Sequence, residues 1–296
     1  MSPNTATVPV LVWLTPALSA LLLYGFGQGL VKKWIGEVSP ARFCLYYVLA
    51  NSVVNIGFAL THEHPALLAA GGRQFMEFGV LAYLFDGMAW ILYFQSVVLG
   101  PVAIVGTLSA AYPALTIIFA RVFLGEALTP LQYFAVTLVI CGGLGLSYAP
   151  ASGEGPATNR RWIPFALLAL LGWGTSNTLI KYAYSLPAAN EANFALCSSI
   201  GGALSLGVFG LLRGRQGPHT LRQWVHSFVP MGMMAGGSLG LIIAAHHGPI
   251  SIVTPLIGAY PVVTIIFAAL VLKERISRLQ YACIGATITG MILCSI

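Results

Sequence analysis

Long apolar runs alternate with short polar connections along the whole chain. A helix that spans the hydrocarbon core of a bilayer needs about 20 mostly apolar residues. Ten runs reach this length, at about 8–31, 41–60, 75–99, 102–124, 128–149, 162–183, 192–212, 225–247, 249–272 and 277–296. The pattern predicts ten membrane-spanning helices and leaves no stretch for a sizeable soluble domain.

Two connections between these runs are very short. They read "LGP" at 99–101 and "HGP" at 247–249. Glycine commonly follows the end of a helix and proline commonly opens one, so each connection predicts a helical hairpin. The longest polar connections, residues 151–161 and 213–223, are Gly-, Pro- and Arg-containing loops.

Composition supports a chain that is solvated by lipid. It is 57% hydrophobic and 7% charged, whereas soluble domains carry about 25% charged residues. The basic residues that give the net charge of +6 form no dense patch. We therefore expect them to set topology and contact headgroups, and we expect no nucleic-acid partner. The first run lacks a preceding basic residue, which favours a span over a cleaved signal peptide.

The second half of the chain repeats the first. "YPALTIIFARVFLGE" at 112–126 returns as "YPVVTIIFAALVLKE" at 260–274, an offset of 148. "YGFGQGLVK" at 24–32 pairs with "WGTSNTLIK" at 173–181, an offset of 149. Each unit would hold five helices, and two tandem copies of an odd unit must cross the bilayer in opposite directions.

The predicted fold is an all-α integral membrane protein with ten transmembrane helices. Residues 1–150 and 151–296 form two five-helix inverted repeats around a central cavity. One face of this arrangement holds most of the Lys and Arg residues, and the other holds only Arg73, Arg121 and Lys181. The richer face is expected in the cytoplasm, which places both termini outside.

These features resemble the drug/metabolite transporter superfamily, specifically its ten-helix EamA-type members. The match is carried by "WGTSNTLIK" and by "FLGEALTPLQYFAVTLVICGG" with its second copy "LVLKERISRLQYACIGATITG". The resemblance covers the whole chain and implies an inverted repeat, a central cavity, alternating access and a place in the bacterial inner membrane. Members move amino acids, nucleotide sugars, sugar phosphates and other metabolites. Residues 62–64, "HEH", match no family pattern and are assigned to a loop.

The third apolar run carries the main candidate for substrate binding. A charged Asp at the bilayer centre costs about 2.5–3.5 kcal/mol, so Asp86 should face protein or a water-filled cavity. On a helix one face would present Tyr83, Asp86, Trp90 and Tyr93. The carboxylate could pair with an ammonium group and the rings could stack on an aromatic side chain. Because burial disfavours its charged form, Asp86 could also exchange a proton for substrate.

A structural interpretation competes with this one. Asp86 could instead bond a Ser, a Thr or the backbone of a neighbouring helix, and the rings could be simple packing. The repeat offers a comparison, because Asp86, Trp90 and Tyr93 have counterparts 148 residues later. These counterparts are Met234, Ser238 and Leu241. A shared cavity would then be aromatic on one wall and open on the other, and the aromatic load resembles the aromatic amino-acid exporters.

Tyr112-Pro113 and Tyr260-Pro261 each lie about halfway along a predicted helix. Proline there removes a backbone hydrogen bond and bends the helix, and in a membrane the freed carbonyl needs a polar partner. We interpret both tyrosines as cavity lining and both prolines as bending points. A static kink is the alternative.

Two ring–amide pairs at i and i+4 share a helix face, Tyr24 with Gln28 and Trp173 with Asn177. A glycine beside each pair permits close helix approach. We expect Gln28, Trp173 and Asn177 to line the cavity in part and to contribute to a helix interface in part.

Charged residues near the helix ends have less specific interpretations. Lys32 and Lys181 are expected to extend to the headgroups, with a gating salt bridge as the alternative. Glu126 and Glu274 precede Thr129 and Ser277. The hydroxyl residues are expected to cap the next helix, and glutamate is favoured beside its N-terminus.

His246 and His247 are adjacent, and residues adjacent on a helix point about 100° apart. No third ligand is near them in the sequence, so we expect interfacial histidines, with a proton relay as the alternative, and no metal site. All five cysteines lie in apolar runs without a CxxC pattern. They are expected to be small buried side chains, and no cofactor is expected.

No P-loop or HExxH motif is present, so the chain is not expected to be an enzyme or to hydrolyse ATP. The expected function is secondary transport, as an exporter of small metabolites and above all amino acids, including aromatic ones. Transport of drugs or cations, or of nucleotide sugars, is the alternative within the superfamily. A passive channel and an intramembrane enzyme are the alternatives outside it. The expected partners are a small-molecule substrate and the bilayer, and the oligomeric state stays open, with a monomer compatible.

Overall fold

A computed structural model describes residues 9–34, 39–62, 72–99, 105, 108–109, 111–147, 160–214, 220–271, 273 and 277–294. All regular structure in these residues is helical. The first half contains α1 (Val10–Trp34), α2 (Pro40–Thr61), α3 (Gly72–Leu99), α5 (Tyr112–Phe119) continued by the π-helix η2 (Ala120–Leu124), and α6 (Pro130–Ser147). The second half contains α7 (Trp162–Ala183), α8 (Glu191–Gly202) continued by η3 (Ala203–Gly207) and α9 (Val208–Arg213), α10 (Leu221–His247), α11 (Ile250–Gly258), α12 (Pro261–Val271) and α13 (Arg278–Cys294).

Seven described segments are long and apolar enough to cross a membrane. They are Val10–Val31, Ala41–Thr61, Gly72–Ser96, Trp162–Ala183, Glu191–Arg213, Leu221–His247 and Ile250–Val271. Tyr112–Leu124 and Pro130–Leu146 are shorter apolar helices. The described residues therefore confirm a multi-pass helical protein but not the predicted count of ten. The predicted helix 102–124 and the "LGP" connection lie partly outside them.

The exterior of the bundle is apolar. Leu60, Leu212 and Leu270 are 82%, 77% and 76% exposed. Exposed leucines at so many helix positions would be costly in water, and they suit contact with lipid tails.

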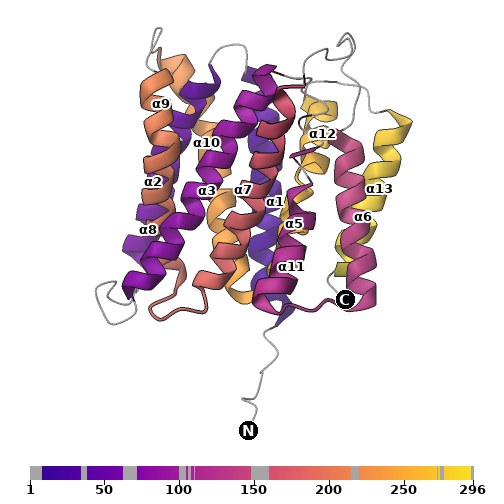
Figure 1. Ribbon diagram of the computed structural model, residues 1–296. Coiled ribbons are helices and arrows are strands. Elements are labelled where there is room, and N and C mark those ends of the chain that lie inside the picture. The colour runs from indigo at the N-terminus through magenta and orange to yellow at the C-terminus, as the bar shows by residue number, and fades with distance from the viewer. Residues whose placement is uncertain are drawn as a thin grey trace.

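Helices from the two halves pair according to the repeat. The repeat makes α7 the counterpart of α1, and α10 the counterpart of α3. In the structure α1 packs against α10 and α3 packs against α7, so these two contacts are equivalent. The pairs α2–α8 and α6–α13 each join a helix to its own counterpart (Figure 1).

The two halves cross the bundle in opposite directions. Trp13, near the start of α1, lies against Gly248, the residue after α10. The Lys181 Nζ, near the end of α7, donates to the Gly248 carbonyl at 2.7 Å. Thus α1 begins on the face where its counterpart α7 ends. In Figure 1, α1 begins and α13 ends on this face, which we call the terminal face.

The opposite face carries basic residues, as the Lys and Arg count expects. Arg42, at the start of α2, donates from Nε to the Gly214 carbonyl at 3.2 Å and from Nη1 to Gln223 Oε1 at 3.5 Å. Arg213 and Arg222 flank these two acceptors in the sequence. The arrangement agrees with the predicted distribution of Lys and Arg between the two faces.

The prolines expected to kink helices mark helix boundaries. α11 ends at Gly258, Ala259 and Tyr260 form a turn, and α12 starts at Pro261. In the first half, Pro113 is the second residue of α5. Proline suits a first turn because its missing N–H would have no partner there. The predicted bend at Pro261 is therefore a complete break of the helix.

Two expectations about charged helix ends were wrong. Lys181 does not extend to headgroups, because its Nζ donates to the Ala245 and Gly248 carbonyls at 2.9 and 2.7 Å and so caps the C-terminus of α10. Glu126 accepts from the Ile250 and Ser251 backbone N–H groups at 3.0 Å each, so it caps α11 in the other half rather than the following helix α6.

The predicted caps of the last helix in each half are confirmed. The Thr129 hydroxyl accepts from the Gln132 N–H at 3.2 Å, and Ser277 accepts from Gln280 in the same way at 3.3 Å. Glu274 and the side chain of Lys32 lie outside the described residues.

Candidate functional site

Two aromatic pairs join the halves of the protein. The Tyr24 and Tyr260 rings lie 6.1 Å apart, and the Tyr112 and Trp173 rings lie 5.7 Å apart. The repeat converts one pair into the other, since Tyr24 corresponds to Trp173 and Tyr112 to Tyr260. The structure thus brings four residues, singled out separately in the sequence, into two equivalent contacts.

One of these pairs is extended by α3. The Trp90 ring lies 5.1 Å from that of Trp173, and the Tyr93 ring lies 5.6 Å from it. The Trp90–Trp173 contact is edge-to-face, an arrangement that the quadrupoles of the rings favour. We call Trp90, Tyr93, Tyr112 and Trp173 the aromatic wall. The predicted face of α3 therefore does meet the predicted face of α7.

Asp86 lies one helical turn from Trp90 and is partly exposed. Its carboxyl is within electrostatic range of the hydroxyls of Tyr24, Tyr47, Tyr83 and Tyr112. Among the described residues, no hydrogen bond or ion pair holds its carboxylate. The structural alternative, an Asp86 bonded to a neighbouring helix, therefore has no support in this part of the chain. A carboxyl group with unused acceptor positions remains beside several hydroxyls.

Tyr83 and Asn177 are less accessible to a substrate than the sequence suggested. Tyr83 is only 5% exposed, and its ring packs edge-on against Phe194 at 6.1 Å. Asn177 is 7% exposed and donates from Nδ2 to the Trp173 carbonyl of its own helix at 3.0 Å. Both residues support the site more than they line it.

Gln28 and Tyr260 line a pocket of about 320 Å³. Its remaining walls are Val31, Leu146, Pro261, Thr264 and Ile265. The volume is at the lower end of the range for small-molecule sites. Because Tyr260 also contacts Tyr24, which is within electrostatic range of Asp86, the pocket adjoins the surroundings of the carboxylate.

The sequence analysis missed Tyr47 and a polar cluster between α2 and α8. Asn55 Nδ2 donates to Asn51 Oδ1 at 2.9 Å, and both amides donate to the Ser198 hydroxyl at 3.3 Å. Two asparagines at i and i+4 inside an apolar run were a usable signal for a buried helix contact. Tyr47 had no comparable signal, since its place depends on how α2 packs.

The expectation that no third ligand lies near His246 and His247 was wrong. The Glu191 carboxylate is 2.7 Å from His246 Nδ1 and 3.0 Å from His247 Nε2. Glu191 begins α8, 55 residues before His246. Sequence spacing could not show this contact, because it depends on the packing of α8 against α10.

Comparison with known proteins agrees with this architecture. The EamA-like transporter family matches the chain twice, over residues 11–148 and 160–296. No curated protein matches it. A solved structure described only as "Crystal structure of protein" is 16% identical, with a TM-score of 0.76, over 96% of this chain and 98% of that one. At this identity the likeness supports the fold alone.

This family consists of transporters and not of enzymes. Its two matches cover nearly the whole chain, one in each repeat. The chain belongs to the EamA-like transporter family and is a multi-pass membrane transporter of the drug/metabolite transporter superfamily.

Proposed function

We propose that this transporter exports amino acids, aromatic ones included, across the bacterial inner membrane by alternating access. The observation that carries the proposal is the Asp86 carboxylate, which lies beside the aromatic wall without a partner among the described residues. A transporter must bind its substrate reversibly. A carboxylate with free acceptor positions can form an ion pair with the substrate and break it again.

The chemistry of the site favours a substrate with an ammonium group and a ring. A carboxylate pairs with ammonium, and Trp and Tyr rings stack on aromatic side chains or on cations. Asp86 is the one formally charged residue among those assigned to the site in the described chain. Nucleotide sugars are disfavoured because their phosphates would need basic groups there.

The two-fold arrangement supports alternating access. Equivalent contacts, Tyr24–Tyr260 and Tyr112–Trp173, lie between the halves, and a proline opens a helical segment beside each. If the halves exchange conformations, these helix boundaries are the points where the backbone has the fewest hydrogen bonds to break. We propose Pro113 and Pro261 as the hinge positions.

Flux into proteoliposomes tests the proposal. The purified protein should move labelled phenylalanine in a saturable way and show counterflow, which a passive channel would not. Asp86→Asn should lower transport at least about tenfold and remove any dependence of the residual flux on a pH gradient. Phe134→Ala is the matched control, because Phe134 is 57% exposed on the outside of α6. Wild-type flux of phenylalanine in Asp86→Asn would overturn the substrate assignment.

A second candidate substrate is an organic cation. Asp86 and the aromatic wall would also suit a cation that lacks a carboxylate group. A competition assay with tetraphenylphosphonium and phenylalanine distinguishes an amino-acid substrate from an organic cation. Inhibition by tetraphenylphosphonium, together with no flux of any amino acid, would favour the cation.

A further inference from the structure

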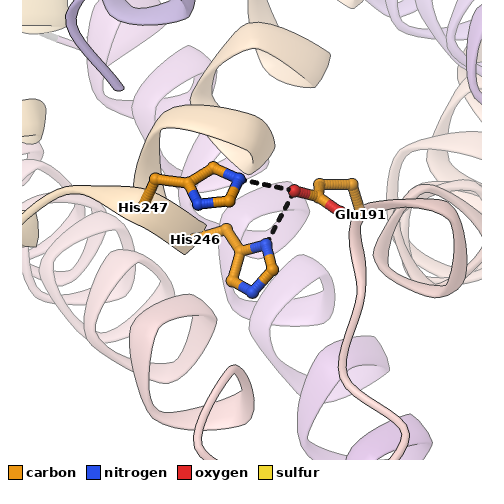
Figure 2. Close-up of side chains that lie close together, drawn as sticks. All are labelled: Glu191, His246 and His247. Carbon is orange, nitrogen blue, oxygen red and sulfur yellow. Dashed lines mark hydrogen bonds and ion pairs between the residues drawn. The ribbon is translucent and has the colours of Figure 1, made fainter. Parts of the chain in front are cut away.

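Three ionisable side chains converge on the terminal face, away from the aromatic wall. Glu191 is the first residue of α8, and His246 and His247 are the last two of α10. Figure 2 shows both imidazoles directed at one oxygen of the Glu191 carboxylate. One possible ligand atom from each side chain lies within 4.8 Å of the other two.

We propose that Glu191, His246 and His247 form a binding site for a divalent transition-metal ion, with Zn²⁺ as the best fit. The site is separate from the proposed substrate site, and the inference does not depend on what is transported.

The donor set matches this ion. Zn²⁺ binds imidazole nitrogens at about 2.0–2.1 Å and carboxylate oxygens at about 2.0–2.2 Å, and three protein ligands leave a fourth position for water. The histidines present different atoms, Nδ1 of His246 and Nε2 of His247. This difference overcomes the expected divergence of adjacent helix residues. An ion placed between them would replace the two hydrogen bonds to Glu191 after small side-chain rotations.

Neighbouring residues already hold two of the proposed metal-binding side chains in position. The Asn190 side chain accepts from the Asn193 N–H at 2.8 Å and thereby fixes the first turn of α8, which carries Glu191. The Tyr184 ring stacks on His246 at 4.4 Å and 10°, and its hydroxyl donates to the Ile242 carbonyl at 2.9 Å. Such outer contacts orient metal ligands and strengthen binding.

Lys181 is a basic group close to the cluster, and its ammonium group points to backbone carbonyls. Its Nζ donates to the carbonyls that end α10, and Glu126 is within electrostatic range of it. These partners reduce the repulsion that a bound cation would feel.

Access and ligand type set the selectivity. The three side chains are between 24% and 32% exposed, so an ion can enter from the terminal face. Ca²⁺ takes six to eight oxygen ligands and Mg²⁺ an octahedral oxygen shell, which one carboxylate does not provide. Two imidazoles favour Zn²⁺, Ni²⁺ and Cu²⁺ instead.

Metal titration of tag-free, chelator-treated protein in detergent tests the proposal. We expect one Zn²⁺ per chain, a rise in Tm on adding Zn²⁺, and no such rise with Mg²⁺. Glu191→Gln and His247→Gln should each weaken Zn²⁺ binding at least about tenfold, because disturbing even the supports of a ligand costs 10–100-fold. His226→Gln is the control. His226 lies 20 residues before His246 on α10, which is about 30 Å along the helix.

Co²⁺ provides a readout that needs no variant. A visible absorption band on adding Co²⁺ to the wild-type protein, displaced by one equivalent of Zn²⁺, would support nitrogen and oxygen ligation. If the wild type binds no stoichiometric Zn²⁺, or if both variants bind it as tightly as His226→Gln does, the proposal is wrong. The cluster is then only a hydrogen-bonded contact between α8 and α10. If one variant fails to fold by circular dichroism, the other variant and the Co²⁺ spectrum decide.

Discussion

Helices α3 and α10 are counterparts in the repeat, and they differ along the face that carries the proposed site. Each packs against the first helix of the other half, α3 on α7 and α10 on α1. Along one face, α3 presents Tyr83, Asp86, Trp90 and Tyr93. At the same positions, α10 presents Met231, Met234, Ser238 and Leu241. The face of α3 has a carboxyl group and aromatic rings, whereas the face of α10 has flexible methionines and smaller side chains.

Contacts that occur in both halves concern helix packing and not substrate binding. A Cβ on Gly25 would meet Val263, and a Cβ on Gly174 would meet Leu115, its equivalent. Close packing of this kind builds the frame, so both copies need it. A substrate such as an amino acid has no two-fold symmetry, so its binding groups need to be present only once. We propose that the face of α3 carries those groups.

The largest expected effect comes from making α3 resemble α10 at one position. Asp86→Met copies Met234 and removes the carboxylate. A hydrogen bond to a charged group contributes about 1.5–3 kcal/mol, so kcat/KM for phenylalanine flux should fall about 10–150-fold. Met234→Leu is the control, because it conserves volume without a charge. Equal flux in both variants would show that the difference between the helices has no role in transport.

A stability comparison tests the shared frame. Gly25→Ala should lower stability by about 1–3 kcal/mol, since the new methyl group would collide with the branched Val263 next to its backbone. Gly174→Ala should cost less, because its Cβ meets the end of the flexible Leu115 side chain at 3.0 Å. Thermal unfolding in detergent measures both. If Gly174→Ala is the more damaging, the two copies of the contact are not packed as described.

Hydropathy and the repeat predicted much of the fold because both can be found in the sequence without knowing which helices pack together. The opposite directions of α1 and α7 followed from an odd number of helices per repeat. The break between Gly258 and Pro261 did not follow, since proline alone does not distinguish a bend from a boundary. The count of ten was also not reached, because some predicted spans are shorter or lie partly outside the described residues.

Contacts were predicted where the residues share one helix face, and they were missed where tertiary packing supplies the partner. Asp86 and Trp90 stood out from the face of α3 alone. Lys181 and Glu126 were misassigned because their acceptors and donors lie 64 and 124 residues further along the chain. The same holds for Glu191, which reaches two histidines only through the packing of α8 against α10.

The aromatic wall can be altered towards its counterpart in two steps. Trp90→Ser copies Ser238, and Tyr93→Leu copies Leu241. Each removes a ring that would stack on the side chain of the substrate, and aromatic pairs contribute about 0.5–1.5 kcal/mol. We expect KM for phenylalanine to rise about 2–13-fold, with a smaller change for alanine, as measured in proteoliposomes. A loss shared equally by both substrates would mean that the rings pack the helices and do not recognise the substrate side chain.

The smallest effect concerns two equivalent threonines. The Thr264 hydroxyl is 3.0 Å from the Gly25 carbonyl in the other half and 3.2 Å from its own Tyr260 carbonyl. Among the residues that the structure describes, the Thr116 hydroxyl contacts only the Tyr112 carbonyl of its own helix, at 3.2 Å. Thr264→Val should therefore cost about 0.5 kcal/mol more than Thr116→Val, because the single hydroxyl proton of Thr264 is shared between two carbonyls and one of them lies in the other half. The difference in Tm should be a few degrees at most. Equal Tm values would show that this bond between the halves adds no stability, which would leave the glycine contacts and the aromatic pairs to hold the frame.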